Sequence, residues 1–275
     1  MRLGVTMFTT DQAMPVADLA RAAEERGLTS LYVPEHTHIP ISRRTPPAAG
    51  QDVLPEEYKR TLDPLVTLAY AAAVTERLTV GTGIMLAAQR DPIVTAKAIA
   101  TLDHLSGGRF VLGVGFGWNV EEMESHGVTY ATRRDVVREH VLAMKELWNR
   151  DVAGFQGRHV SFEPSWSWPK PVAGPPVLIG GAAGPKLFAH VAEYADGWIP
   201  IGGKGVKDAL PALREACEKA GRDPAAIKVI PFGTVPSAGK LEYYAGLGIE
   251  EVVCSLPSAP AATILPILDD YSSFL

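Results

Sequence analysis

The segment at residues 33–38, VPEHTH, places a carboxylate beside an imidazole, Glu35 and His36, directly after a short apolar run. An imidazole can take or give a proton near neutral pH, and a neighbouring carboxylate can orient it or bind a polar ring. His36 and His38 also have a spacing found in metal sites, but the other histidines fall in expected helices and loops. The pattern therefore favours proton chemistry over a metal, with a structural pair in a loop as the alternative.

Two glycine-rich segments follow later apolar runs and could bring their backbone close to a ligand. GTGIM at residues 81–85 has two glycines at a strand end, which usually mark a bulge, a barrel corner or a close approach of backbone to ligand. GFGWN at residues 115–119 offers backbone N–H groups, although its glycine spacing differs from a dinucleotide fingerprint. The candidate cofactor-binding residues in these segments are Thr82, Gly83, Ile84, Gly115, Phe116, Gly117 and Asn119.

GGAAGPK at residues 180–186 is the strongest local signal for an anion. Its small residues allow a close approach, Pro185 is expected to open a helix, and Lys186 adds positive charge. Free amides and the dipole at a helix N-terminus bind phosphate groups. The segment predicts a phosphate site, with a tight turn built only for close packing as the alternative. Its candidate residues are Gly180, Gly181, Ala182, Ala183, Gly184 and Pro185.

These segments must be positioned by the elements around them. Short β-branched runs alternate with helical patterns along the chain. Eight strands are expected, at residues 3–8, 30–33, 78–84, 110–115, 177–180, 197–201, 227–232 and 251–255. Eight strand–helix alternations in 275 residues predict one domain over residues 1–275, a closed (β/α)8 TIM barrel. Because the carboxyl ends of barrel strands form one face, Glu35, His36 and the glycine-rich segments are expected to converge there.

Two long connections interrupt the alternation, at about residues 35–60 and 154–176, and both are rich in proline. Loops of this length in a compact domain tend to be functional or disordered. The second connection also carries Trp166 and Trp168, which favours a segment that closes over something. We expect both connections to be lid-like insertions.

Composition excludes several classes of protein. The net charge is −5 and is spread along the chain without a basic block, which argues against a nucleic-acid partner. The apolar runs are far shorter than the roughly 20 residues of a membrane span. Cys217 and Cys254 lie in expected regular elements without a CxxC partner, which indicates buried free thiols in a reducing cytoplasm.

Taken in order, these segments resemble the bacterial luciferase-like monooxygenase superfamily, and within it the branch that uses the deazaflavin coenzyme F420. The resemblance is carried by AAEERGLTSL at 22–31, PEH at 34–36, LTVGTGI at 78–84, RDP at 90–92, LDHLSGGRF at 102–110 and GVGFGW at 113–118, and by the segments at 133–148, 175–181 and 195–198. The ordered set covers most of the chain.

The resemblance implies where the cofactor would lie. The deazaflavin ring would rest against residues 82–84, with a cis peptide between Gly83 and Ile84, and its phosphate would sit on residues 180–184. Glu35 and His36 match the position that approaches the reactive face of the ring. Arg133 matches a family arginine near the polar portion of the cofactor. The last two strands lack the basic residues that family members use for a phosphorylated sugar, which argues against that substrate.

The sequence and the resemblance together predict hydride transfer between F420 and a small, largely apolar organic substrate. His36 is the candidate catalytic proton carrier, or else a wall of the pocket, and Glu35 would orient it or bind the cofactor. Two alternatives stay open: an FMN-dependent monooxygenase with a partner reductase, and a non-catalytic F420-binding protein. The resemblance also implies a homodimer formed by outer helices at about residues 64–75 and 92–105.

Overall fold

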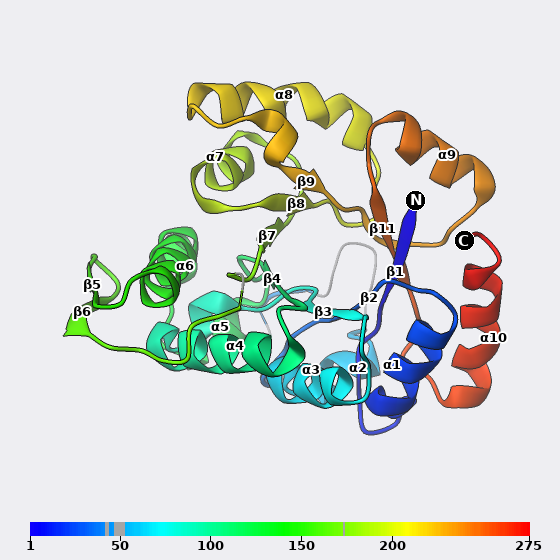
Figure 1. Ribbon diagram of the computed structural model, residues 1–275. Helices are drawn as coiled ribbons and strands as arrows, with labels where there is room; N and C mark the ends of the chain where they lie inside the picture. The colour runs from blue at the N-terminus through cyan, green and yellow to red at the C-terminus, as the bar shows by residue number, and fades with distance from the viewer. Residues whose placement is uncertain (42–43, 47–52, 173) are drawn as a thin grey trace.

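A parallel sheet curled into a barrel forms the centre of the protein (Figure 1). The computed structural model describes residues 1–41, 44–46, 53–172 and 174–275. The barrel strands are β1 (Arg2–Thr6), β2 (Ser30–Val33), β3 (Thr79–Thr82), β4 (Phe110–Val114), β7 (Val177–Gly180), β8 (Gly197–Ile199), β9 (Lys228–Val229), β10 (Phe232–Thr234) and β11 (Glu251–Ser255). In space they follow the order β10-β11-β1-β2-β3-β4-β7-β8-β9, with parallel pairing throughout.

The barrel closes at the strand that the sequence predicts at residues 227–232. The structure divides that strand into β9 and β10, because Pro231 between them has no N–H to give to the ladder. Closure is nevertheless made by Phe232, whose N–H donates to Pro200 O at 3.0 Å and whose carbonyl accepts from Gly202 N at 2.7 Å. The predicted (β/α)8 barrel is confirmed, with this one strand in two pieces.

Helices form the outer layer of the barrel (Figure 1). They are α1 (Val16–Glu25), α3 (Pro64–Ala73), α4 (Pro92–Ser106), α6 (Arg133–Asn149), α7 (Pro185–Tyr194), α8 (Val206–Lys219), α9 (Ala238–Gly246) and α10 (Ala261–Ser272). Shorter helical segments lie in the connections: α2 (Glu56–Arg60), η1 (Ala87–Gln89), α5 (Val120–Ser125), η2 (Tyr130–Thr132) and η3 (Pro224–Ala226). Asp63 and Asp91 cap α3 and α4 with their side chains, each before a proline that fits the first helical turn.

Two apolar layers hold these elements together. The interior of the barrel is filled by a small cluster made of Tyr32, Leu178, Ile199, Ile230, Phe232 and Val253. A much larger cluster lies between the barrel and its helices and includes Leu3, Leu19, Leu68, Ile99, Val141 and Val191. The filled interior makes the strands a rigid frame for side chains at their carboxyl ends. Both cysteines, Cys217 and Cys254, are buried free thiols, as predicted.

The connection at 154–176 contains structure that the sequence did not predict. β5 (Ala153–Gln156) and β6 (Ser161–Ser165) form an antiparallel hairpin. The carboxylate of Glu139 on α6 accepts the backbone N–H groups of Arg158 and His159 at its turn, at 3.1 and 2.6 Å. The hairpin therefore lies beside α6, outside the helical layer (Figure 1). Residues 42–43 and 47–52 of the other predicted insertion, at 35–60, lie outside the described part, and a lid role for either connection stays a prediction.

No helix among the described residues is long and apolar enough to cross a membrane.

Candidate functional site

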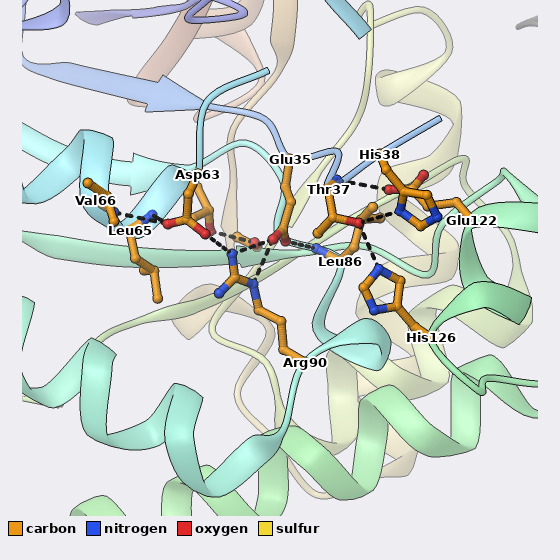
Figure 2. A network of polar contacts seen from close by, with 12 residues as sticks. Glu35, Thr37, His38, Asp63, Leu65, Val66, Leu86, Arg90, Glu122 and His126 are labelled. Atoms are coloured by element: carbon orange, nitrogen blue, oxygen red, sulfur yellow. Dashed lines mark hydrogen bonds and ion pairs between the residues drawn. The ribbon is translucent and has the colours of Figure 1, made fainter. Parts of the chain in front are cut away.

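Glu35, directly after β2, is held at the centre of an ion-pair network (Figure 2). Its side chain is 1% exposed, and its Oε2 accepts the backbone N–H of Leu86 at 2.7 Å. Its Oε1 accepts Nε of Arg90 at 2.6 Å, and Nη2 of Arg90 also donates to Asp63 at 2.6 Å. Glu35 thus ties the end of β2 to the segment after β3 and, through Arg90, to the capping residue of α3.

His36, the next residue, makes a buried pair with a carboxylate from α5. Its Nδ1 lies 2.7 Å from Oε2 of Glu122, and the two side chains are 6% and 0% exposed. The other oxygen of Glu122, Oε1, accepts the backbone N–H of Thr37 at 3.1 Å. Figure 2 shows the side chain of Glu122 directed toward Thr37. The contact joins the loop after β2 to the helix that follows β4.

Aromatic rings from two separate segments lie against the imidazole of His36. Tyr58 on α2 lies 5.1 Å away between ring centroids, and Trp118, after β4, lies 5.9 Å away. Tyr58 also contacts Phe8, after β1, at 4.7 Å. Burial raises the pKa of Tyr58, with a contribution from Glu57, so its hydroxyl stays neutral near pH 7. His36 therefore lies between a buried carboxylate and two aromatic rings.

The bulge after β3 is formed as the resemblance implied. The Gly83–Ile84 peptide is cis, Gly83 N donates to Val33 O at 2.8 Å, and Thr82 Oγ1 donates to Gly113 O at 2.7 Å. Ile84 then lies against Gly115 and Gly180, where added Cβ atoms would collide with its side chain. These two glycines make room for Ile84. They do not need a ligand to explain them.

Asn119 is a buried polar side chain whose amide group has no partner in the part of the chain that the structure describes. It is 1% exposed, and neither its Oδ1 nor its Nδ2 has a hydrogen bond to the described residues. Leaving such groups unsatisfied costs about 1–3 kcal/mol each, so sites of this kind are usually completed by water or a ligand. Asn119 follows Trp118 directly, which places this unsatisfied amide beside the segment that contacts His36.

Arg133 and Arg134, at the start of α6, lie against different neighbours, and a buried nitrogen of each (Arg133 Nε, Arg134 Nη1) has no partner among the described residues. Arg133 donates from Nη1 to Tyr130 O at 2.7 Å and lies over the Tyr130 ring at 3.6 Å, so it contacts η2. Arg134 lies over the ring of Phe116 at 4.3 Å, and its Nη1 is buried without a partner among the described residues. The structure therefore brings Arg134, rather than Arg133, against the Gly115–Gly117 turn.

The predicted phosphate segment has the expected form, but not all of its amides are available. Gly181 N already donates to Ile199 O at 3.2 Å, and Gly181 O accepts Nε1 of Trp198 at 2.9 Å. Gly184 precedes α7 without a side-chain cap, and Pro185 occupies the first helical turn. A Cβ added at Gly184 would meet no atom within 4 Å. The candidate donors are therefore the amides that follow Gly181, at the open start of α7.

Sequence reasoning missed Glu122, Tyr58, Arg90 and Arg134. Glu122 and Arg134 lie on helices whose charged residues read equally well as solvent-exposed faces. Tyr58 lies in a connection with no periodic pattern. Arg90 precedes the Asp91–Pro92 helix start and carries no signal that would pair it with Glu35. Among the described residues, no group of three or more His, Cys, Asp or Glu side chains is placed to hold a metal ion.

Comparison with known proteins identifies the family. The model of the luciferase-like monooxygenase family matches residues 1–241. The chain belongs to this family. An uncharacterized protein of Mycobacterium tuberculosis is 43% identical over 265 residues, 95% of this chain and 94% of that protein. F420-dependent glucose-6-phosphate dehydrogenases of Kineococcus radiotolerans and Nakamurella multipartita are 32% and 31% identical over 75% of this chain. The chain spans 59% of the length of each dehydrogenase.

Solved structures share the fold. An F420-dependent secondary alcohol dehydrogenase has a TM-score of 0.78 at 17% identity, covering 100% of this chain and 98% of its own. The monooxygenase RslO1 of Streptomyces bottropensis has a TM-score of 0.76 at 19% identity, with the same coverage. The FMN-bound oxygenating constituent of 3,6-diketocamphane monooxygenase from Pseudomonas putida has a TM-score of 0.64 at 20% identity, covering 84% of this chain and 66% of its own. At these identities the likeness concerns the fold alone.

Proposed function

We propose that this protein is an F420-dependent oxidoreductase that acts on a small, largely apolar organic substrate. The glucose-6-phosphate dehydrogenases among its relatives are F420-dependent, which supports the deazaflavin branch of the family. In the structure, the observation that carries the proposal is the buried pair of His36 and Glu122 in an apolar, aromatic setting, next to the unsatisfied amide of Asn119.

The residues at the strand ends fit a cofactor with a polar ring and an anionic tail. Asn119 offers a donor NH₂ group and an acceptor oxygen to a polar ring edge, and the amides after Gly181 suit a phosphate. The exposed Lys186, Lys204 and Lys207 lie at or just before the first turns of α7 and α8 and would attract further negative charge. Exposed charges are screened by salt, so this part of the affinity should fall as salt rises.

His36 is the residue we assign to the proton. A bound deazaflavin supplies two-electron hydride transfer and reacts poorly with oxygen. When the substrate is an alcohol, its carbon would give a hydride to the oxidised deazaflavin, its hydroxyl proton would pass to His36, and a carbonyl group would form. The rings of Tyr58 and Trp118 exclude water from the imidazole. General acid–base help of this kind contributes roughly 10²–10⁴-fold in rate.

Glu35, which the sequence also nominates for catalysis, is assigned a positioning role. Both of its oxygens already accept hydrogen bonds, from Leu86 N and from Arg90. An ionised carboxylate that is buried and paired has little capacity left for a proton or a substrate. Glu35 would instead hold the bulge after β3, against which the cofactor ring is expected to lie.

The aromatic walls support an apolar substrate rather than a phosphorylated sugar. Two arginines whose carboxylate partners adjoin His36 or Glu122 in the sequence are already paired: Arg90 binds Glu35 and Asp63, and Arg44 binds Glu121 and Glu124. β10 itself contains no basic residue, and the amine of Lys240, which lies at its end, already donates to Thr234 Oγ1 and to Val235 O. A phosphate dianion would therefore be poorly matched here, whereas a small alcohol with a hydrocarbon body would suit the rings.

Titration of the purified protein with F420 and with FMN tests the cofactor. We expect tighter binding of F420, and an affinity that falls with salt. Equal or tighter binding of FMN would favour the monooxygenase alternative, which needs oxygen and a partner reductase.

Turnover tests the chemistry. F420 is mixed with isopropanol, cyclohexanol or benzyl alcohol, and loss of the visible absorbance of the oxidised cofactor is followed. His36→Asn keeps a polar side chain that cannot titrate, so turnover should fall at least about a hundredfold with F420 affinity nearly unchanged. Tight F420 binding with no turnover of any of these alcohols would favour the non-catalytic F420-binding alternative. Weakened F420 binding in His36→Asn with normal saturated turnover would make His36 a pocket wall.

We further propose that the protein is a cytoplasmic homodimer. Large apolar side chains are exposed on the neighbouring helices α3 and α4, among them Val66, Tyr70, Ile93 and Val94. Such a patch on outer helices is typical of a surface covered by a partner. Light scattering should give the mass of a dimer for the parent protein and of a monomer for Val94→Lys. A monomeric parent would contradict the proposal.

A further inference from the structure

We propose that Glu122 is a positioning residue for the reaction, because it holds the proton of His36 on Nδ1 and leaves Nε2 as the nitrogen that exchanges a proton with the substrate. The inference rests on the proposed role of His36 and adds a residue that neither the motifs nor the comparisons identify.

The contacts of Glu122 fix its hydrogen-bonding role. Its side chain is fully buried, Oε1 accepts the N–H of Thr37 at 3.1 Å, and Oε2 lies 2.7 Å from Nδ1 of His36. An ionised carboxylate can only accept hydrogen bonds. The backbone N–H of Thr37 occupies Oε1, so Oε2 is the oxygen that accepts from His36, and the proton between Glu122 and His36 belongs on Nδ1. The tautomer of a histidine is set in this way by the partner of its other nitrogen.

This arrangement also fixes the imidazole in space. The contact runs from α5, which follows β4, to the loop after β2, and so bridges two barrel strands that are separated by β3. Tyr58 and Trp118 flank the ring and limit its rotation. A hydrogen bond to a charged group in such apolar surroundings is stronger than one in water. The imidazole is therefore held before any substrate binds.

A purely structural role is the rival explanation. The neighbouring Glu121 shows what that role looks like, because its carboxylate accepts the backbone N–H and the hydroxyl of Thr45 and also pairs with Arg44. Glu121 ties the connection at 35–60 to α5 without contacting His36. Glu122 could do the same through Thr37 alone. The two carboxylates thus provide a matched pair, of which only Glu122 should influence the imidazole.

The ¹⁵N NMR spectrum of the His36 ring in the cofactor-free protein tests the inference without any substrate. We expect a protonated Nδ1 in the parent protein. In Glu122→Gln, the amide oxygen can still accept from Thr37 while its NH₂ group donates to His36, so Nδ1 should lose its proton and Nε2 should carry it. Glu121→Gln should leave the tautomer of His36 unchanged.

Two results would overturn the inference. One is a parent protein in which Nδ1 of His36 is unprotonated and Nε2 is protonated; this result does not depend on the folding of any variant. The other is a folded Glu122→Gln protein whose His36 spectrum matches that of the parent.

Turnover of isopropanol, cyclohexanol or benzyl alcohol separates this inference from the proposed function. Glu122→Gln should lower kcat by about 10²–10⁴-fold with a much smaller change in KM, and should add no further loss in a His36→Asn background. Additive losses would show that Glu122 does not act through His36. If His36→Asn keeps normal turnover, the proton role of His36 fails, while the NMR result still decides whether Glu122 sets the tautomer.

Discussion

Replacing Arg90 by methionine should destabilise the protein far more than removing an ion pair from its surface. Arg90 is 19% exposed and donates to Glu35, whose side chain is 1% exposed, and to Asp63. In Arg90→Met the carboxylate of Glu35 would stay buried with Leu86 N as its remaining partner. Removing one member of a buried pair costs about 3–5 kcal/mol, because it leaves an uncompensated buried charge.

The loss of stability can be measured as a decrease in Tm. A change of 1 kcal/mol shifts Tm by about 2–4 °C in proteins near this size, so Arg90→Met should lower Tm by roughly 6–20 °C. The matched control is Arg138→Met, which breaks a pair with Glu193 between side chains that are 39% and 43% exposed. A surface pair of this kind contributes about 0–1 kcal/mol, so the control should shift Tm by at most about 4 °C.

A second substitution tests whether the unpaired charge of Glu35 causes the loss of stability. In Glu35→Gln/Arg90→Met the buried charge is gone, and the glutamine oxygen can still accept from Leu86 N. We therefore expect the double variant to regain at least half of the lost Tm, measured by calorimetry at pH 7. If Arg90→Met melts within the range of Arg138→Met, or if the double variant melts lower still, the network around Glu35 does not hold this end of the barrel.

Three further outcomes follow from the structure. Gly184→Val adds a side chain in open space before α7 and should weaken F420 binding at least about tenfold with Tm nearly unchanged, because one or two charge-assisted hydrogen bonds worth roughly 1.5–3 kcal/mol each would be lost. Gly246→Val, also in open space, is the control, and equal F420 affinity in Gly184→Val would show that the turn only serves packing. The hydroxyl of Thr45 and nearby backbone amides lower the pKa of Glu121 from 4.5 to about 2. The Tm deficit of Glu121→Gln should therefore be full above pH 4.5 and be lost as the pH falls through about 2, where the folded protein takes up the proton; a deficit independent of pH would contradict this. Burial raises the pKa of Cys254 to about 12, so Ellman's reagent at pH 8 should label it only after unfolding, and fast labelling of the native protein would refute its burial.

The sequence by itself determined the fold and the family. Alternation of strand and helix patterns predicts the barrel because each βα unit carries its own local signals, such as the Asp91–Pro92 start of α4. The same local logic located the strand ends and therefore the neighbourhood of His36. Local patterns could not predict features that depend on contacts between distant segments. The break at Pro231 and the β5–β6 hairpin depend on pairing between distant segments, which no periodicity within one segment reports.

Only the tertiary structure decided what each side chain contacts. Adjacent in sequence, Glu35 and His36 look like one catalytic pair, yet Glu35 binds Arg90 and His36 binds Glu122. Gly115 and Gly180 are predicted ligand contacts in the sequence, and the structure adds that both make room for Ile84. Arg90 lies 55 residues from Glu35 along the chain, and Glu122 lies 86 residues from His36. They meet because β2, β3 and β4 are consecutive strands of the barrel, so the segments that follow them gather at one end. Sequence spacing carries no record of such contacts, because burial and charge pairing are properties of the closed barrel.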